Sequence, residues 1–184
     1  MLLAIDVGNT NTVLGLFAGD DLVRSWRVKT DAHETADEIA LKLRGLLEGA
    51  PEFSGIALCS TVPSVLREMR TTLDRYYHDV DCVIVEPGVK TGVPINTDNP
   101  KEVGADRIVN SLAAYSLYGG PSIVVDFGTS TNLDVVSAKG EFIGGALAPG
   151  IEISIDALAS RAAQLRKIEL VAPRSAIGST PCCR

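Results

Sequence analysis

Short apolar runs alternate along the chain with longer segments in which apolar residues recur at helical spacing. The short runs in the first part predict strands at residues 2–5, 12–17, 22–29, 55–59 and 82–85. The longer segments predict helices at residues 35–48, 63–77 and 105–118, and Thr35 and Glu38 have the spacing of a capping box. Strands that start as a hairpin and then alternate with helices predict a mixed sheet covered by helices.

The last third of the chain repeats the opening pattern. Residues 2–16 read LLAIDVGNTNTVLGL and residues 122–136 read SIVVDFGTSTNLDVV. Each has an apolar run, an aspartate, a glycine turn with hydroxyl residues and a second apolar run, and the two aspartates, Asp6 and Asp126, are 120 positions apart. A repeated strand-turn-strand unit predicts two domains of like fold facing each other across a cleft, here residues 1–118 and 119–184.

The second unit is predicted to contain strands at residues 122–126, 131–137 and 141–148 and a helix at residues 151–165. Only 64 residues remain from Pro121 onward, against 118 in the first unit, so we expect the second domain to be incomplete. Apolar strand residues such as Ile123 and Leu133 would then be exposed. We therefore expect the chain alone to be unstable and to be poorly active or inactive.

The repeated turn is suited to binding phosphate. Gly8 and Gly128 allow close approach of the backbone, and successive N–H groups, with Thr and Asn side chains, can point at one phosphate oxygen. A carboxylate beside a polyphosphate would repel it unless a cation, typically magnesium, lies between them. The alternative is an ordinary hairpin with an Asx-type turn. Two copies, each after an apolar strand, favour the site for a cation and a phosphate.

The composition restricts the class of partner. Hydrophobic residues make up 46% of the 184 residues and charged residues 22%, as in a globular protein, and a net charge of −6 without a long basic cluster argues against nucleic acid. No stretch has the length of a transmembrane helix or the pattern of a signal peptide, so we expect a cytoplasmic protein with no membrane partner. The cysteines lack disulfide or zinc spacing, and we interpret them as buried or incidental thiols: Cys59, Cys82, Cys182 and Cys183.

Four motifs, in this order, resemble the type III pantothenate kinases: DVGNTNT, TDNPKEVGADRIVN, VVDFGTSTNLDVV and GGALAPGIEIS. That family is part of the ATPase superfamily of actin and the acetate and sugar kinases. The resemblance implies an α/β fold of duplicated ribonuclease H-like domains with a mixed five-stranded sheet, truncated here in the second domain. It also implies ATP-dependent phosphorylation of pantothenate to 4′-phosphopantothenate, the first step of coenzyme A biosynthesis. The enzyme would be a homodimer that uses Mg2+ and a monovalent cation, K+ or NH4+.

The resemblance also implies roles for single residues. In the segment VGADR, Asp106 would accept the proton of the pantothenate hydroxyl and Arg107 would help hold the substrate, although by position alone Asp106 could be a plain acidic residue in the first turn of a helix. Asp6 would lie near magnesium, and Asp126 would bind the monovalent cation. The residues implied to bind pantothenate are Gly104, Ala105, Asp106 and Arg107. The residues implied to bind ATP are Asp6, Val7, Gly8, Asn9, Thr10, Asn11, Thr12, Val13 and Thr129.

Two positions depart from the family pattern. Thr97 stands where many relatives have Tyr, so the aromatic wall of the substrate pocket would be missing or supplied otherwise, and Pro181 stands where a threonine usually reaches the substrate. Cys182 and Cys183 suggest either a metal-binding tail or an artificial terminus, of which we favour the second. Besides a pantothenate kinase, the sequence leaves open a non-catalytic remnant or accessory protein that keeps part of the nucleotide-binding fold. A kinase for another small hydroxyl substrate is a third hypothesis.

Overall fold

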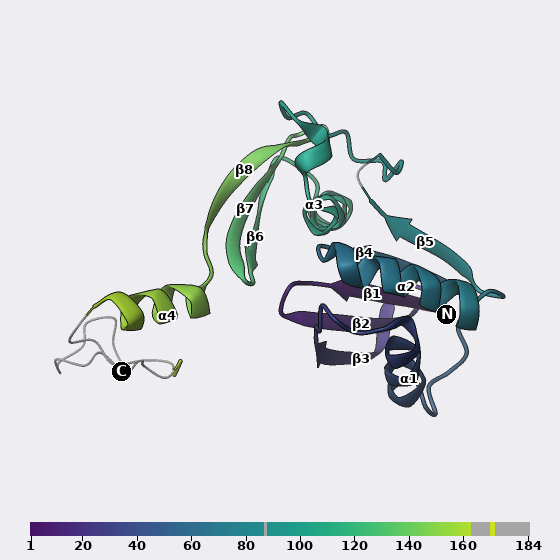
Figure 1. Cartoon of the computed structure of the whole chain (residues 1–184). Helices are drawn as coiled ribbons and strands as arrows, with labels where there is room; N and C mark the ends of the chain where they lie inside the picture. Colours follow the sequence, from purple (N-terminus) through teal and green to yellow (C-terminus); the bar gives the residue numbers. More distant parts are fainter. Residues whose placement is uncertain (87, 163–169, 172–184) are drawn as a thin grey trace.

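The computed structural model of the chain describes residues 1–86, 88–162 and 170–171. Its first sheet has five strands in the order β3-β2-β1-β4-β5 (Figure 1). The strands are β1 (Leu2–Val7), β2 (Asn11–Ala18), β3 (Asp21–Lys29), β4 (Gly55–Ser60) and β5 (Asp81–Val85). The first three strands form an antiparallel meander, whereas β4 and β5 run parallel to β1. The prediction of a mixed five-stranded sheet is therefore confirmed.

Two helices cover one face of this sheet: α1 (Ala36–Leu46) and α2 (Pro63–Tyr76). The predicted capping box begins α1, because the Thr35 hydroxyl accepts from the Glu38 N–H while the Glu38 carboxylate accepts from the Thr35 N–H. The core on this face contains Leu3, Ile5, Val7, Leu14, Leu16, Ile39, Leu43, Ile56, Leu58, Val65, Met69 and Leu73. Each fully buried Leu or Ile contributes about 1.5–3 kcal/mol, so this face fixes the register of the sheet.

The opposite face of the first sheet carries the charged residues Asp6 and Arg27. Because successive residues of a strand point to opposite faces, Asp6 points away from the core that its neighbours Ile5 and Val7 fill. Asp6 pairs with Val13 on one side and with Cys59 on the other, and Val13 pairs with Arg27. One row across the sheet therefore presents these four side chains on the same face.

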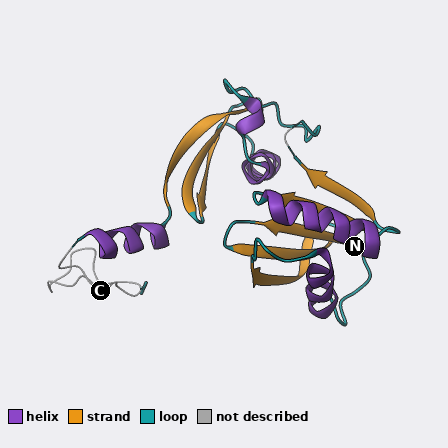
Figure 2. Ribbon diagram, in the orientation of Figure 1, coloured by secondary structure: helices purple, strands orange, loops and turns teal. Residues whose placement is uncertain are grey.

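A third helix, α3 (Ala105–Tyr118), follows a short 3-10 helix η1 (Pro100–Glu102) and lies between the first sheet and a second one (Figure 2). The second sheet has the antiparallel order β6-β7-β8, with β6 (Ser122–Phe127), β7 (Ser130–Val136) and β8 (Phe142–Pro149). A small buried cluster joins α3 and the loop before it to β8: Val93, Val103, Ile108 and Phe142. Gly119, with φ of 76°, ends α3 in a conformation that favours glycine.

The elements predicted after residue 119 are also present. The last helix, α4 (Ile151–Arg161), extends from the end of β8 away from the first sheet (Figure 1). It ends earlier than the predicted residue 165, because Ala162 already has non-helical backbone angles. One face of the second sheet packs on α3, and the other leaves Ile123 64% and Leu133 37% exposed. The predictions for Pro181, Cys182, Cys183 and the tail Ser179–Arg184 concern positions outside the described residues.

Within the described part of the chain, none of the helices combines the length and the apolar composition that crossing a membrane requires.

Candidate active site

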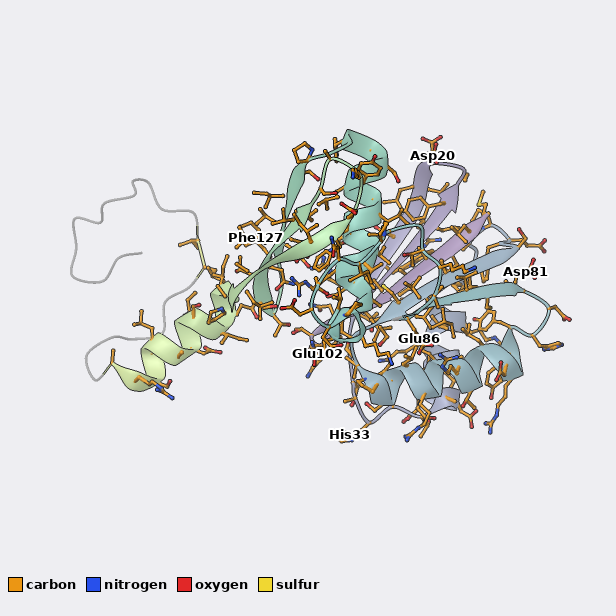
Figure 3. The ribbon with its side chains drawn as sticks, turned by 90° about the horizontal axis from the view of Figure 1, so that it is seen from above. Asp20, His33, Asp81, Glu86, Glu102 and Phe127 are labelled. Carbon is orange, nitrogen blue, oxygen red and sulfur yellow. The ribbon has the colours of Figure 1, made fainter. Side chains whose placement is uncertain are left out.

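A cavity of about 630 Å³ opens between the face of the first sheet that carries Asp6, the start of α3 and the β6–β7 turn. Figure 3 shows this region from above, with Phe127 marking the end of β6. Most of the predicted site residues line this cavity: Asp6, Gly8, Asn9, Thr10, Asn11, Val13, Asp106, Asp126 and Thr129. The fold therefore brings together residues from the two repeats and from the VGADR segment.

Five of the predicted residues do not line the cavity: Val7, Thr12, Gly104, Ala105 and Arg107. Val7 and Thr12 point into the core instead, and the Thr12 hydroxyl shares a hydrogen bond of 2.9 Å with the Thr30 hydroxyl. Val7 and Thr12 alternate along their strands with residues that line the cavity, because successive residues of a strand point to opposite faces of the sheet. Any contact of Val7 or Thr12 with a ligand would therefore use backbone atoms.

The two repeated turns face each other across the cavity. Each is closed by a backbone hydrogen bond, from the Gly8 N–H to the Asn11 carbonyl (3.0 Å) and from the Gly128 N–H to the Ser130 carbonyl (2.9 Å). The hydroxyls of Thr10 and Thr129, one from each turn, lie 3.0 Å apart and share a hydrogen bond. Two hydroxyl donors and the turn backbones are thus directed at one small volume, which suits a phosphate group.

Three carboxylates surround this volume: Asp6 from β1, Asp106 from α3 and Asp126 from β6. Burial raises the pKa of Asp106, and the charges of Asp6 and Asp126 raise it further, whereas a backbone hydrogen bond at Arg107 opposes the shift. The charges of Asp6 and Asp126 therefore disfavour the ionised form of Asp106 unless a cation enters.

The carboxylates fit a magnesium ion that keeps most of its water. Among the described residues, no group of three His, Cys, Asp or Glu side chains is placed to hold one metal ion. Mg2+ commonly takes one or two carboxylates together with phosphate oxygens and water, so a pre-formed protein cage is not required. Asp6, beside the first turn, meets this requirement.

A cysteine holds the Asp6 carboxylate in place. The thiol of Cys59, 8% exposed, donates a hydrogen bond of 3.2 Å to Asp6 Oδ1. Burial is the first cause of the raised pKa of the Cys59 thiol, followed by the charge of Asp6, so the thiol stays protonated and remains a donor. The sequence predicted a buried or incidental thiol at this position, and Cys59 is buried. Its role depends on the pairing of β4 with β1, for which the sequence around Cys59 has no signal.

The start of α3 positions Asp106. Gly104 is the N-cap residue, and a Cβ at this position would collide with Asp106 Oδ1. The absence of a side chain therefore leaves room for the carboxylate in the first turn, where free backbone N–H groups favour a negative charge.

Arg107, the next residue, points to a different partner. Its Nε and Nη2 both donate to Asp134 Oδ1, at 2.8 and 2.5 Å, and its guanidinium lies 5.1 Å from the centre of the Phe142 ring. Asp134 is fully buried, and among the described residues its second oxygen has no hydrogen-bond partner. The structure therefore ties α3 to β7 through an ion pair that the sequence analysis did not anticipate. The sequence holds one signal that Asp134 is buried. It stands two residues after Asn132, so both residues face inward on β7.

The chain is similar to known proteins over nearly its whole length. Residues 2–181 match the family model described as type III pantothenate kinase. The type III pantothenate kinase of Salinispora arenicola (strain CNS-205) is 70% identical over 179 residues, which are 97% of this chain and 71% of that protein. The type III pantothenate kinase of Frankia alni (strain DSM 45986 / CECT 9034 / ACN14a) is 70% identical over 180 residues, 98% of this chain and 72% of that protein.

A solved structure shares the fold. The chain is similar to a protein from Sinorhizobium meliloti assigned as a 2-dehydro-3-deoxygalactonokinase, with a TM-score of 0.56 and 19% identity. The similarity covers 89% of this chain and 58% of that protein, so the chain spans less than two thirds of its length. At this identity the likeness concerns the fold alone, an α/β architecture that a sugar kinase also adopts.

Proposed function

The chain belongs to the type III pantothenate kinase family, and from this premise we propose that it phosphorylates pantothenate with ATP. The product is 4′-phosphopantothenate, and the reaction is the first step of coenzyme A biosynthesis. The observation that carries the proposal is the meeting of both repeated turns and Asp106 on one cavity. A non-catalytic role is not favoured, because the three carboxylates expected of the kinase all line this cavity.

The proposal gives a role to each wall of the cavity. The backbone of the first turn and the hydroxyls of Thr10 and Thr129 hold the phosphates of ATP, and pantothenate binds at the start of α3, where Asp106 is the residue of the Gly104–Arg107 segment that lines the cavity. The pantothenate hydroxyl oxygen attacks the γ-phosphorus, the bond from that phosphorus to the β-phosphate oxygen breaks, and ADP leaves. Asp106 orients the hydroxyl and accepts its proton late in the reaction. A raised pKa makes this carboxylate a better base than an ordinary aspartate.

The duplicated aspartates hold two different cations in this proposal. Asp6 holds Mg2+ and Asp126 holds K+ or NH4+. When bound there, Mg2+ would supply positive charge that offsets the charge of the phosphates. The Cys59 thiol keeps the Asp6 carboxylate oriented toward the cavity.

Substrate-dependent release of ADP tests the proposed function. The chain is incubated with Mg-ATP and K+ in the presence of pantothenate, of pantothenate lacking its terminal hydroxyl, or of a simple sugar. Release should require pantothenate with the hydroxyl present. Release that a sugar stimulates as strongly as pantothenate would contradict the assignment of the substrate.

Replacing each duplicated aspartate should change the response to a different ion. Asp6→Asn should raise the Mg2+ concentration needed for half-maximal rate by about tenfold or more, because a carboxylate ligand is lost. Asp126→Asn should leave the Mg2+ response near that of the parent and weaken activation by K+. Titration of each ion against both variants measures this, and identical responses of the two variants would argue for one shared site.

The second turn should be sensitive to Gly150, the residue before α4. The Gly150 N–H donates to the Thr129 carbonyl (3.0 Å), and a Cβ at Gly150 would collide with the carbonyl oxygens of Gly128 and Thr129. We expect Gly150→Ala to displace the turn and weaken Mg-ATP binding by about tenfold. Calorimetric titration measures the affinity. Gly45→Ala is the matched control, because a Cβ at the exposed Gly45 meets nothing within 4 Å and stabilises α1 by about 0.5–1 kcal/mol.

The repeat supports a duplicated ribonuclease H-like architecture with units at residues 1–118 and 119–184. In both hairpins the aspartate stands one residue before the end of the first strand, and it pairs with Val13 in the first and with Asn132 in the second. We also include in the proposal a homodimer and a cytoplasmic location, where ATP is available. Equilibrium sedimentation tests the dimer.

A further inference from the structure

Arg27 stands out among the side chains on the cavity wall. Of the described residues that line the cavity, it is the only Lys or Arg, whereas four carboxylates share the wall: Asp6, Asp106, Asp126 and Glu152. Within the described part of the chain, the Arg27 side chain forms no hydrogen bond or ion pair. The other arginine near the site, Arg107, is held by Asp134. The cavity therefore has one cationic side chain that is available to a ligand.

The sheet directs Arg27 toward the cavity. Its neighbours Trp26 and Val28 pair with Leu14 and Thr12, which face the helices, so Arg27 faces the other way. Arg27 is two strands from Asp6 in the same row, which corresponds to about 10 Å between backbones at the usual strand spacing. A long side chain at that position extends over Val13 toward the volume beside Asp6. The next residue of β3 on the same face as Arg27 is Lys29, which pairs with Asn11 at the end of the first turn.

We propose that Arg27 binds an anionic oxygen of the substrates, namely a β- or γ-phosphate oxygen of ATP. The inference rests on the proposed function, because it deepens the description of the same site. A guanidinium presents a planar fork that can pair two oxygens of one phosphate. Both substrates carry anionic oxygens, since pantothenate has a carboxylate. The phosphate is the favoured occupant because Arg27 belongs to the sheet that forms the first turn, whereas Asp106, which receives the pantothenate hydroxyl, comes from α3 on the other wall.

The charges on the wall make this contact important. A polyphosphate that enters a cavity with four carboxylates meets repulsion, which a divalent cation at Asp6 offsets only in part. Arg27 adds a fixed positive charge that is already in place and loses no partner inside the protein on binding. A charge-assisted hydrogen bond of this kind corresponds to about a tenfold to hundredfold gain in affinity.

The test compares Arg27→Gln, Arg27→Lys and a control, Arg24→Gln. Arg24 lies on the same strand, stacks on Trp26 and does not line the cavity. Its replacement therefore removes the same charge without changing the cavity wall. Calorimetry measures binding of Mg-ATP and of AMP to each full chain without pantothenate, and steady-state kinetics then gives KM for pantothenate. We expect Arg27→Gln to weaken Mg-ATP binding by about tenfold to a hundredfold and AMP binding by less than about twofold. Arg27→Lys should be intermediate, and Arg24→Gln should match the parent.

Each other outcome decides against the proposal. An unchanged affinity for Mg-ATP with a raised KM for pantothenate would assign Arg27 to the substrate carboxylate, and no change in either would remove it from the site. Equal weakening of AMP and ATP would show a general effect rather than a phosphate contact. The binding measurement requires no phosphoryl transfer. A chain that binds Mg-ATP through Arg27 and fails to phosphorylate pantothenate would therefore contradict the proposed function and still support this inference.

Discussion

Asp106→Asn should lower kcat for pantothenate phosphorylation by about 10²- to 10⁴-fold, with KM for ATP little changed. The amide keeps the shape of the side chain but loses the charge that orients the hydroxyl and accepts its proton. Steady-state kinetics at saturating substrates measures the loss. Asp20→Asn is the control, because Asp20 lies at the β2–β3 turn, apart from the β6–β7 turn that Phe127 marks (Figure 3), and its replacement removes the same charge. A kcat of Asp106→Asn within about twofold of the parent would remove Asp106 from the catalytic role.

The same variant should be more stable than the parent at neutral pH. Burial, and then the charges of Asp6 and Asp126, raise the pKa of Asp106 in the folded chain, and backbone hydrogen bonds at Arg107 and at Asp106 itself oppose the shift. The folded state thus binds more protons than the unfolded state, so this carboxylate destabilises the fold as pH rises above the ordinary aspartate pKa of about 3.9. Thermal unfolding in EDTA should show a higher Tm for Asp106→Asn at pH 7 and a difference that shrinks toward pH 4. A difference that does not depend on pH would contradict this account of the carboxylate.

Breaking the ion pair between Arg107 and Asp134 should have the largest effect on stability. Asp134 is 0% exposed and the Arg107 side chain 23%, so Asp134→Leu leaves a largely buried guanidinium without its partner. We expect a loss of about 3–5 kcal/mol in the free energy of unfolding for Asp134→Leu or Arg107→Leu alone. The double variant should lose less than either single variant, because no uncompensated charge remains. Urea unfolding of the four proteins measures this coupling, and strictly additive losses would contradict it.

The kinetics of conservative variants should separate two roles of Arg107. If Arg107 positions Asp106 through α3, its replacement should affect kcat. Asp134→Asn should then lower kcat in parallel with Arg107→Lys. If Arg107 instead binds the pantothenate carboxylate, KM for pantothenate should rise in Arg107→Lys and stay unchanged in Asp134→Asn. We expect the parallel loss of kcat, because Arg107 Nε and Nη2 both donate to Asp134 Oδ1.

Local patterns were enough to predict the elements. The alternation of apolar residues predicted the strands, Thr35 and Glu38 predicted the start of α1, and the recurrence of Asp6 as Asp126 predicted two like units that face each other across a cleft. The parts that were missed depend on contacts between distant strands. In the sequence, Arg27 is an ordinary charged residue of an edge strand. Only the register of β1, β2 and β3 shows that it lies in the same row as Asp6. Arg107 and Asp134 lie in different elements, and no local pattern couples them.

The most direct test of the account is the detection of the phosphoester itself. The purified chain is incubated with pantothenate, Mg-ATP and K+, with Asp106→Asn in parallel, and the products are analysed by mass spectrometry and phosphorus NMR. We predict a phosphate ester on the terminal hydroxyl of pantothenate, formed together with an equal amount of ADP, from the parent chain and not from the variant. No ester from a parent chain that binds Mg-ATP, or an equal amount of ester from both proteins, would contradict a phosphoryl-transfer site built from the two repeated turns and Asp106.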